Sequence, residues 1–358
     1  MSLSSLLLAA AMRAAAAPAP LSWKPDWPVL KAAVRGRIER TLAEGRLPIL
    51  DVENSYNDAF MNGPAIQAAL DKRGIVAVAW SPEEEERLLK ERGVSWWLER
   101  WPLMLKDLAA RVPGAVLPVP PAGGIQDPAS QELAREVLAQ AEAGGFPMLG
   151  EYFFRHYSSD LDVEVSAPAD LSVPIDGPFG RELFAYAERT GKPFELHYEV
   201  EDALLPALER MLSRYPKARV IWCHAARVRY PGKATRFLRD PAGAVRGLLE
   251  RHPNLYFDLS SLGLSVYPGN GQVPTLWWDP QTHHLYPQWE RLLVDHPWRF
   301  MTALDTGMDR AADNPGKGSL MRGMLLELPP ETRRIVAYRA FWKLVFGETL
   351  PDGSGPAR

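Results

Sequence analysis

The feature that most constrains this chain is a regular alternation of short apolar runs with helical segments. Eight runs rich in β-branched and aromatic residues begin near residues 47, 74, 115, 146, 193, 218, 254 and 299. Between them lie segments such as 63–74, 131–145 and 202–216, which repeat apolar residues every three or four positions and stop at Gly or Pro. Eight β-then-α units predict an α/β fold of the (β/α)8 TIM-barrel type, with a doubly wound sheet as the alternative.

The same pattern divides the chain into four parts. We expect residues 1–22 to be a flexible or targeting segment and residues 23–45 to form a helix that caps the bottom of the barrel. The barrel itself should span residues 46–348, and residues 349–358 should be a disordered tail. The apolar, alanine-rich start carries Arg13 in its middle and lacks early basic residues, so cytoplasmic and exported locations both stay open.

Composition excludes several classes of partner and site. The 41 basic and 44 acidic residues leave a net charge of −3, which gives no case for nucleic-acid binding. No run in the body of the chain approaches the roughly 18 apolar residues of a membrane span. The single cysteine, Cys223, rules out an internal disulfide, and strand alternation predicts that its side chain points away from the barrel mouth. The sequence leaves open whether the chain forms a homo-oligomer.

Three connections are long and polar, namely residues 155–177, 262–288 and 306–318. All three follow the carboxyl ends of predicted strands, which form the catalytic face of such barrels. We therefore expect lid or substrate loops there. Trp277 and Trp278 in the second loop could cover a ligand ring, or they could pack the loop onto the barrel.

Polar residues gather at the same strand ends. They are Asp51, Glu53, Ser55, Glu151, His197, His224, Asp258 and Asp305. Any one of them taken alone is more simply explained as a structural residue, but imidazoles and carboxylates that converge on one mouth are costly to desolvate unless they bind a cation. Nitrogen and oxygen ligands of this kind suit Zn²⁺, Mn²⁺ or Fe²⁺.

The segments that carry these residues resemble the amidohydrolase superfamily, in its amidohydrolase-related branch. They are "LGEYFF" with Glu151, "GKPFELHYEV" with His197, "YPKARVIWCHAARV" with His224, "RHPNLYFDLS", and "HPWRFMTALDT" with Asp305. The resemblance implies one or two divalent metal ions, zinc first among them, held by Glu53, Glu151, His197, His224 and Asp305. It also implies that the metal activates water, that Asp305 takes the proton, and that His224 or His197 steadies charge in the transition state.

The first strand departs from the family pattern. Where the family has Asp-x-His-x-His, this chain reads Asp51-Val52-Glu53-Asn54-Ser55. Glu53 could replace the first histidine as an anionic ligand, with water beside Ser55. The metal could instead bind only the other four ligands. The third alternative is a degenerate site in a ligand-binding protein.

The function expected from this resemblance is metal-dependent hydrolysis of a small ester, lactone, amide or phosphoester. The alternatives are non-hydrolytic decarboxylation of a small acid and metal-free ligand binding on the same barrel. Tyr56, Asn57, Arg155, Arg227 and Arg229 are candidate substrate-binding residues, since arginines clamp carboxylates and phosphates. That predicts an anionic substrate, although ion pairs with loop acids would explain the arginines equally well.

Overall fold

The structure is a computed structural model that describes residues 21–56, 63–82, 91–157, 170–260, 264–267, 271–279, 281–306 and 315–350. The predicted targeting segment lies outside this range except for residues 21 and 22, and so does the tail from residue 351 onward. Asn57 and parts of all three predicted lid loops also lie outside the described residues.

The strands form two groups of mostly parallel neighbours. The first has the order β1 (Ile49–Tyr56), β2 (Ile75–Pro82), β3 (Val116–Pro118). The second has the order β14 (Phe300–Met301), β9 (Leu255–Asp258), β8 (Val220–Trp222), β7 (Phe194–Tyr198), β5 (Leu149–His156), β4 (Gly123–Gly124), with the short β6 (Leu171–Ser172) antiparallel to β5. The eight predicted runs all contain a strand.

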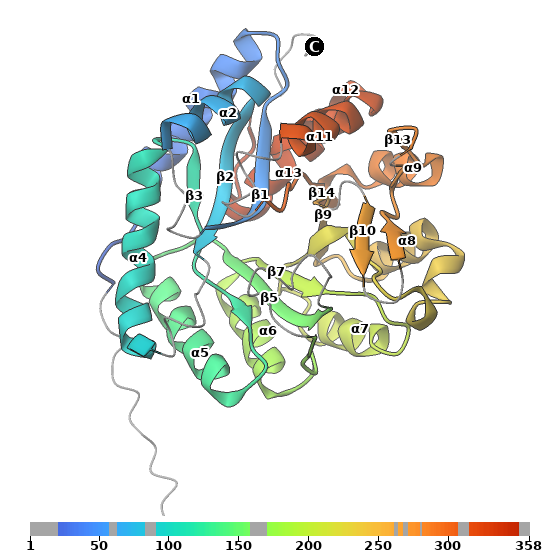
Figure 1. The fold of residues 1–358 in the computed structure, drawn as a ribbon, viewed down its shortest axis with the longest axis horizontal. Coiled ribbons are helices and arrows are strands. Elements are labelled where there is room, and N and C mark those ends of the chain that lie inside the picture. Colours follow the sequence, from blue (N-terminus) through green and yellow to red (C-terminus); the bar gives the residue numbers. More distant parts are fainter. Residues whose placement is uncertain are drawn as a thin grey trace, which may run out of the picture.

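Helices surround the strands as an outer ring (Figure 1). They are α1 (Trp27–Ala43), α2 (Gly63–Arg73), α4 (Val94–Arg111), α5 (Pro128–Ala143), α6 (Pro178–Thr190), α7 (Leu205–Arg214), α8 (Pro241–Arg251), α9 (Pro287–Asp295), α11 (Pro315–Glu327), α12 (Pro330–Arg334) and α13 (Ala340–Phe346). Local sequence explains their ends: Asp127 and Ser130 make a capping box at the start of α5, and Gly191 ends α6 in the left-handed conformation.

Hydrogen bonds join the first strand to the last. The Val52 amide donates to the Thr302 carbonyl at 3.1 Å, and the Thr302 hydroxyl donates to the carbonyls of Leu50 at 2.5 Å and Ala337 at 3.1 Å. Ala337 belongs to a π-helical turn, Ile335–Arg339, between α12 and α13. These bonds bring β1 beside the segment after β14, and the predicted (β/α)8 barrel is confirmed.

Helix α1 packs at the end of the barrel where the strands begin. Its N-cap, Asp26, accepts from the Val29 amide at 3.2 Å. Its Arg37 donates to the Val76 carbonyl at 2.7 Å, near the start of β2, and pairs with Asp71 at 2.7 Å. The helix predicted within residues 23–45 therefore lies away from the carboxyl ends of the strands.

The segment after β9 carries two small antiparallel pairs, β10 (Leu264–Tyr267) with β11 (Gly271–Pro274) and β12 (Trp278–Asp279) with β13 (His284–Leu285). Trp277 and Trp278 are each 1% exposed and belong to the hydrophobic core. Of the two alternatives for these tryptophans, packing of the loop onto the barrel is the one observed.

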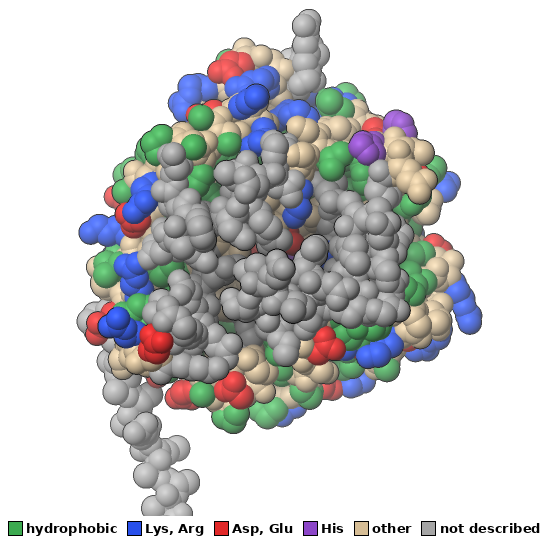
Figure 2. All heavy atoms as spheres, viewed as in Figure 1, with side chains coloured by type: hydrophobic (Ala, Val, Ile, Leu, Met, Phe, Trp, Pro, Cys, Tyr) green, Lys and Arg blue, Asp and Glu red, His purple; other side chains and the backbone are tan. Residues whose placement is uncertain are grey.

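In the view of Figure 2, both acidic and basic side chains lie around the rim of the described surface. Within the described part of the chain, no helix has the length and apolar character needed to cross a membrane.

Candidate active site

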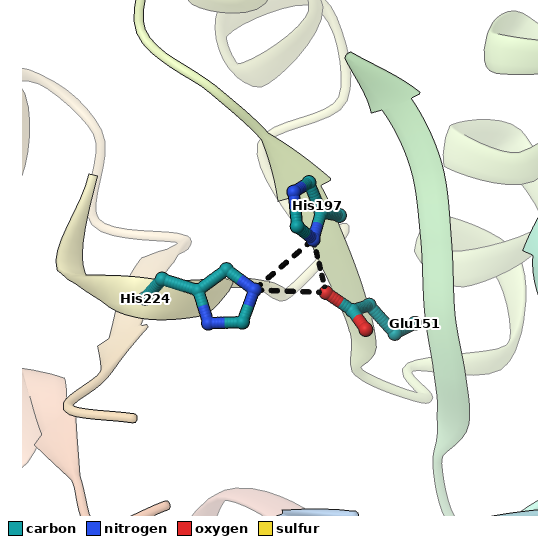
Figure 3. Close-up of side chains that lie close together, drawn as sticks. All are labelled: Glu151, His197 and His224. Carbon is teal, nitrogen blue, oxygen red and sulfur yellow. Dashed lines mark hydrogen bonds and ion pairs between the residues drawn. The ribbon is translucent and has the colours of Figure 1, made fainter. Parts of the chain in front are cut away.

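Three neighbouring strands bring Glu151, His197 and His224 together at the carboxyl end of the barrel (Figure 3). Glu151 comes from β5, His197 from β7, and His224 from the turn directly after β8. His197 Nδ1 lies 2.7 Å from Glu151 Oε1 and 3.0 Å from His224 Nε2, while His224 Nε2 lies 3.3 Å from Glu151 Oε1. The three atoms therefore form a compact triangle.

A left-handed turn places His224 in this triangle. β8 ends at Trp222, and His224, Ala225 and Ala226 follow with φ values of 62°, 48° and 60°. Such backbone at non-glycine residues costs on the order of 1–3 kcal/mol each. The His224 amide donates to Asp258 Oδ1 at 2.9 Å, which helps to hold the turn.

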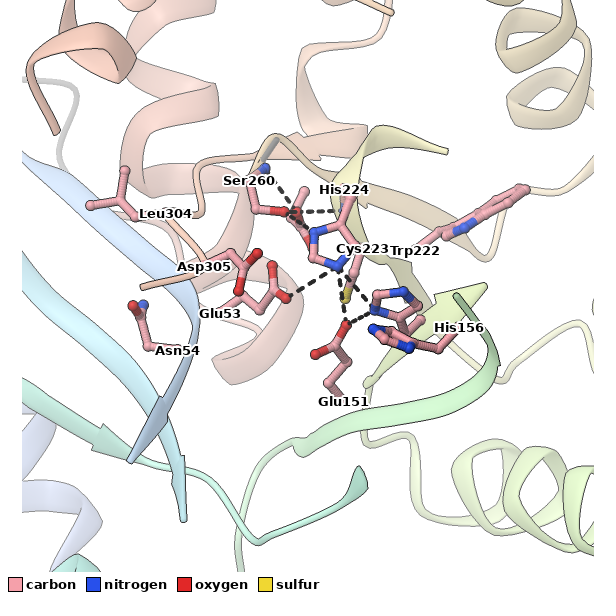
Figure 4. Close-up of polar contacts among 12 residues, drawn as sticks. Glu53, Asn54, Glu151, His156, Trp222, Cys223, His224, Ser260, Leu304 and Asp305 are labelled. Carbon is pink, nitrogen blue, oxygen red and sulfur yellow. Dashed lines mark hydrogen bonds and ion pairs between the residues drawn. The ribbon is translucent and has the colours of Figure 1, made fainter. Parts of the chain in front are cut away.

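The same turn corrects the prediction for Cys223. Strand alternation placed its side chain away from the mouth, but its sulfur lies within 4.8 Å of carboxylate oxygens of Glu53 and Glu151 (Figure 4). The predicted direction is wrong because the strand ends one residue earlier, so both Cys223 and His224 reach the interior. Burial, reinforced by the nearby carboxylates, raises the pKa of the Cys223 thiol, which keeps it protonated.

His224 is oriented by a hydrogen-bonded chain through Ser260 to Asp258. The Ser260 hydroxyl donates to Asp258 Oδ1 at 2.6 Å, so its oxygen is left to accept from His224 Nδ1, also at 2.6 Å. With its proton on Nδ1, His224 turns the lone pair of Nε2 toward Glu151 and His197.

His197 has a corresponding partner on its far side. Its Nε2 lies 3.1 Å from Glu199 Oε1, and Glu199 in turn pairs with Arg229 at 2.7 Å. With the proton of His197 on Nε2, Nδ1 also presents a lone pair. Two nitrogen lone pairs and one carboxylate oxygen then converge on a single point, an arrangement that needs positive charge.

The first strand adds Glu53. Its register against β2 shifts between Asp51 and Asn54, a β-bulge, so simple alternation does not hold beyond Asp51. Glu53 Oε1 nevertheless lies 3.7 Å from His224 Nε2, and neither of its oxygens has a hydrogen-bond partner among the described residues. Burial, followed by repulsion from Asp258, Glu151 and other carboxylates, raises the pKa of Glu53 well above its ordinary value.

Asp305 completes a second group of candidate ligands. Ligand atoms of Glu53, His224 and Asp305 lie within 4.8 Å of one another, and this group shares His224 with the first (Figure 4). Asp305 has a left-handed φ of 47°, and its amide donates to the Glu53 carbonyl at 3.2 Å. Lys317 from α11 donates to the carbonyls of Leu304 at 2.8 Å and Asp305 at 2.7 Å.

The charges of the first group favour a cation. Although burial acts against it, interaction with the imidazoles of His197 and His224 holds the pKa of Glu151 below its ordinary value, so Glu151 offers an ionised oxygen; without a cation, protons on the imidazoles would supply the positive charge. Burial also opposes protonation of His197, yet Glu151 and Glu199 raise the pKa of that imidazole overall. Ligand atoms about 2.0–2.2 Å from a tetrahedral zinc ion stand about 3.3–3.6 Å apart, so shifts of less than about 1 Å would fit the triangle to zinc.

The structure thus brings the five residues predicted as ligands into two groups that share His224, and it gives two of the predicted substrate-binding arginines carboxylate partners within the chain. Arg155 pairs with Glu201 at 2.5 Å and donates to the Leu171 carbonyl at 2.7 Å. Arg229 pairs with Glu199, and Arg227 is half-buried with interactions of its own. The side chain of Tyr56 lies outside the described part, so its predicted role and that of Asn57 stay predictions.

Sequence reasoning missed the residues that orient the two histidines. Ser260 stands two positions after Asp258, and Glu199 two positions after His197, so strand alternation could have pointed to both. Lys317 lies twelve residues after Asp305, in the first turn of α11, and no local sequence pattern links it to the site.

A family model described as amidohydrolase matches residues 98–309, a segment that contains Glu151, His197, His224 and Asp305 but not β1. The sequence finds no match among curated proteins.

Solved structures match almost over their whole length. An uncharacterised TIM-barrel protein from Bordetella bronchiseptica is 11% identical, with a TM-score of 0.52 over 84% of this chain and 99% of that one. An amidohydrolase from Burkholderia multivorans with bound zinc is 15% identical, with a TM-score of 0.46 over 85% and 100%. A 2,6-dihydroxybenzoate decarboxylase in complex with 2,6-dihydroxybenzoate is 14% identical, with a TM-score of 0.46 over 84% and 99%.

Proposed function

The chain belongs to the amidohydrolase family, and from this premise we propose that the barrel mouth is the active site of a metal-dependent hydrolase. Its substrate would be a small-molecule ester, lactone, amide or phosphoester. The observation that carries the proposal is the convergence of Glu151 Oε1, His197 Nδ1 and His224 Nε2 within 3.3 Å of one another.

These three residues would hold a divalent cation, with zinc preferred because the donors are two imidazoles and a carboxylate. Glu53 and Asp305, which share His224 with the first group, offer ligands for a second ion. When bound there, a divalent cation supplies a Lewis acid that polarises a carbonyl or phosphoryl oxygen and lowers the pKa of water.

The chain's own side chains would carry the proton and the charge. Asp305, held at the rim by Lys317, is the proposed acceptor for the proton of the attacking water. His224, held by Ser260 through Nδ1, would act on the negative charge of the substrate oxygen only as a ligand of the cation, through Nε2. Trp277 and Trp278 hold the loop after β9 on the barrel and so help to exclude solvent.

Decarboxylation of a small acid is the second candidate, and Glu53 favours it. An acidic residue in place of a neutral histidine adds negative charge, which opposes the ionisation of water. Burial and its carboxylate neighbours also raise the pKa of Glu53, so the same side chain could instead be protonated and serve as an acid. As the bond between carbon and carboxylate breaks and CO₂ leaves, the electron pair left on carbon would take that proton.

Metal analysis followed by substrate screening tests the proposal. Protein purified without chelator should contain one or two equivalents of divalent metal and should hydrolyse a chromogenic ester, lactone, amide or phosphoester. Glu151→Gln should lower both the metal content and the turnover, whereas Glu132→Gln, on an exposed position of α5, should lower neither. Release of CO₂ from small acids without hydrolysis would favour decarboxylation, and absence of metal would contradict both.

A further inference from the structure

A buried ion pair stands directly behind the imidazole of His197. Glu199 Oε1 lies 3.1 Å from His197 Nε2 and 2.7 Å from Arg229 Nε. The side chains of His197, Glu199 and Arg229 are 4%, 1% and 6% exposed, so water does not compete for these contacts. Arg229 also donates to the Tyr157 carbonyl, which ties the pair to the end of β5.

We propose that Glu199, held by Arg229, is a positioning residue that fixes both the ring and the proton of His197. By accepting from Nε2, Glu199 leaves Nδ1 as the nitrogen that faces Glu151 and His224. This inference rests on the proposed function, because its purpose is to prepare His197 as a metal ligand. A carboxylate behind a ligating histidine sets the tautomer and makes the imidazole a stronger donor.

The aromatic packing around His197 does not fix the orientation of its ring. The edge of the His197 ring meets Phe153 at 5.1 Å between centroids, and the His156 ring lies 4.8 Å away. Neither contact distinguishes the present ring from one turned by 180° about the Cβ–Cγ bond. A turned ring would present carbon where Nδ1 and Nε2 now stand, so the contacts with Glu151 and Glu199 both select this orientation, and the bond to Glu199 places the proton on Nε2.

Arg229 explains why Glu199 positions His197 and does not bind a cation itself. His156, His197 and Glu199 also form a group with metal-ligand spacing. The guanidinium of Arg229 already supplies the positive charge at Glu199, and it lies 3.4 Å from His156 Nε2. Arg229 therefore acts through Glu199 here, a role different from the substrate clamp expected from the sequence.

Cobalt binding to full-length protein tests the proposal without relying on catalysis. Removing only one partner would leave a buried charge unpaired and could unfold the chain, so both partners are replaced together. Glu199→Leu with Arg229→Met removes the acceptor, whereas Glu199→Gln with Arg229→Met keeps an acceptor oxygen without charge. Glu201→Leu with Arg155→Met is the matched control, since that buried pair joins β5 to the segment after β7 and, among the described residues, makes no bond to His197.

The leucine variant should bind Co²⁺ roughly 10–100-fold more weakly than wild type, with an altered ligand-field spectrum. The glutamine variant should recover most of the affinity and the wild-type spectrum, and the Glu201 control should match wild type. Circular dichroism checks that each variant is folded. If wild type binds Co²⁺ and the leucine variant binds it equally well with the same spectrum, the positioning role is wrong while the proposed function stands. If wild type binds no Co²⁺, the proposed function itself fails and the positioning role falls with it.

Discussion

Asp51 and Asn54 lie on either side of Glu53 in β1, and their side-chain oxygens accept hydrogen bonds from the backbone of the segment that follows β14. Asp51 Oδ1 accepts from the Leu304 amide at 2.8 Å, and Asn54 Oδ1 accepts from the Thr306 amide at 3.1 Å. Glu53 itself reaches the barrel mouth, where neither of its carboxylate oxygens has a hydrogen-bond partner among the described residues. Of the polar residues at the end of β1, Asp51 and Asn54 thus hold the segment that carries Asp305, and Glu53 is a candidate metal ligand.

Glu53→Gln should change metal binding and metal-free stability in opposite directions. With metal present, the loss of a ligand charge should lower the bound metal measurably, whereas Ser55→Ala should leave it unchanged. In chelator, the variant should be more stable than wild type, because a neutral amide replaces a buried carboxyl that is repelled by its neighbours.

The stability gain of Glu53→Gln should grow with pH. The folded wild type keeps a proton on Glu53 at pH values where the unfolded chain, with a pKa near 4.5, has lost it. Wild-type stability therefore falls as the pH rises from about 4.5 toward the raised folded pKa, and the variant lacks that loss. Urea unfolding in chelator at pH 5 and pH 8 measures the difference. An equal gain at both pH values would show that the charge of Glu53 is not the cause.

At the scale of elements, the sequence predicted the strands and helices because each one carries its own periodicity and its own stop signals. The ends of strands were less predictable. The bulge in β1 and the left-handed turn after β8 depend on bonds to distant segments, such as the one from the His224 amide to Asp258. Alternation therefore failed for Cys223, although it would have found Glu199 and Ser260. The candidate ligands were identifiable from residue type and strand position, whereas the partners that orient them depend on tertiary contacts.

Helix α11 should influence the site through Lys317. Its ammonium binds the carbonyls of Leu304 and Asp305, and removing it would leave both without that donor. Lys317→Met should destabilise the fold by about 1–3 kcal/mol and weaken Co²⁺ binding, because the left-handed turn at Asp305 loses its support.

Lys192→Met is the matched control for Lys317→Met. Lys192 is half-buried and donates to the Ala141 carbonyl at 3.2 Å, at the end of the barrel where β7 begins. It should lower stability without affecting Co²⁺ affinity. Equal cobalt affinities for Lys317→Met and wild type would contradict a role for α11 in the site.

At the scale of the whole molecule, the proposed cation would join elements that are distant in sequence. Its candidate ligands come from β1, β5 and β7 and from the segments after β8 and β14, so nearly the full length of the barrel contributes. A ligand that binds only the folded state stabilises it, by about 2.7 kcal/mol when its free concentration is 100 times the Kd.

Zinc should therefore raise the free energy of unfolding of wild type by about that amount under such conditions. Denaturant unfolding in buffered zinc and in chelator measures the difference. Glu151→Gln should show a much smaller increase than wild type. An increase in Glu151→Gln as large as that in wild type would place the stabilising zinc elsewhere in the molecule.

Anomalous scattering from crystals grown with zinc tests the central claim most directly, because it locates the ion in the protein. The account predicts a zinc peak at the barrel mouth, about 2.0–2.2 Å from His197 Nδ1, His224 Nε2 and a carboxylate oxygen of Glu151. A second peak beside Glu53 and Asp305 would show a two-ion site. Saturating zinc without a peak bounded by Glu151, His197 and His224 would contradict the account.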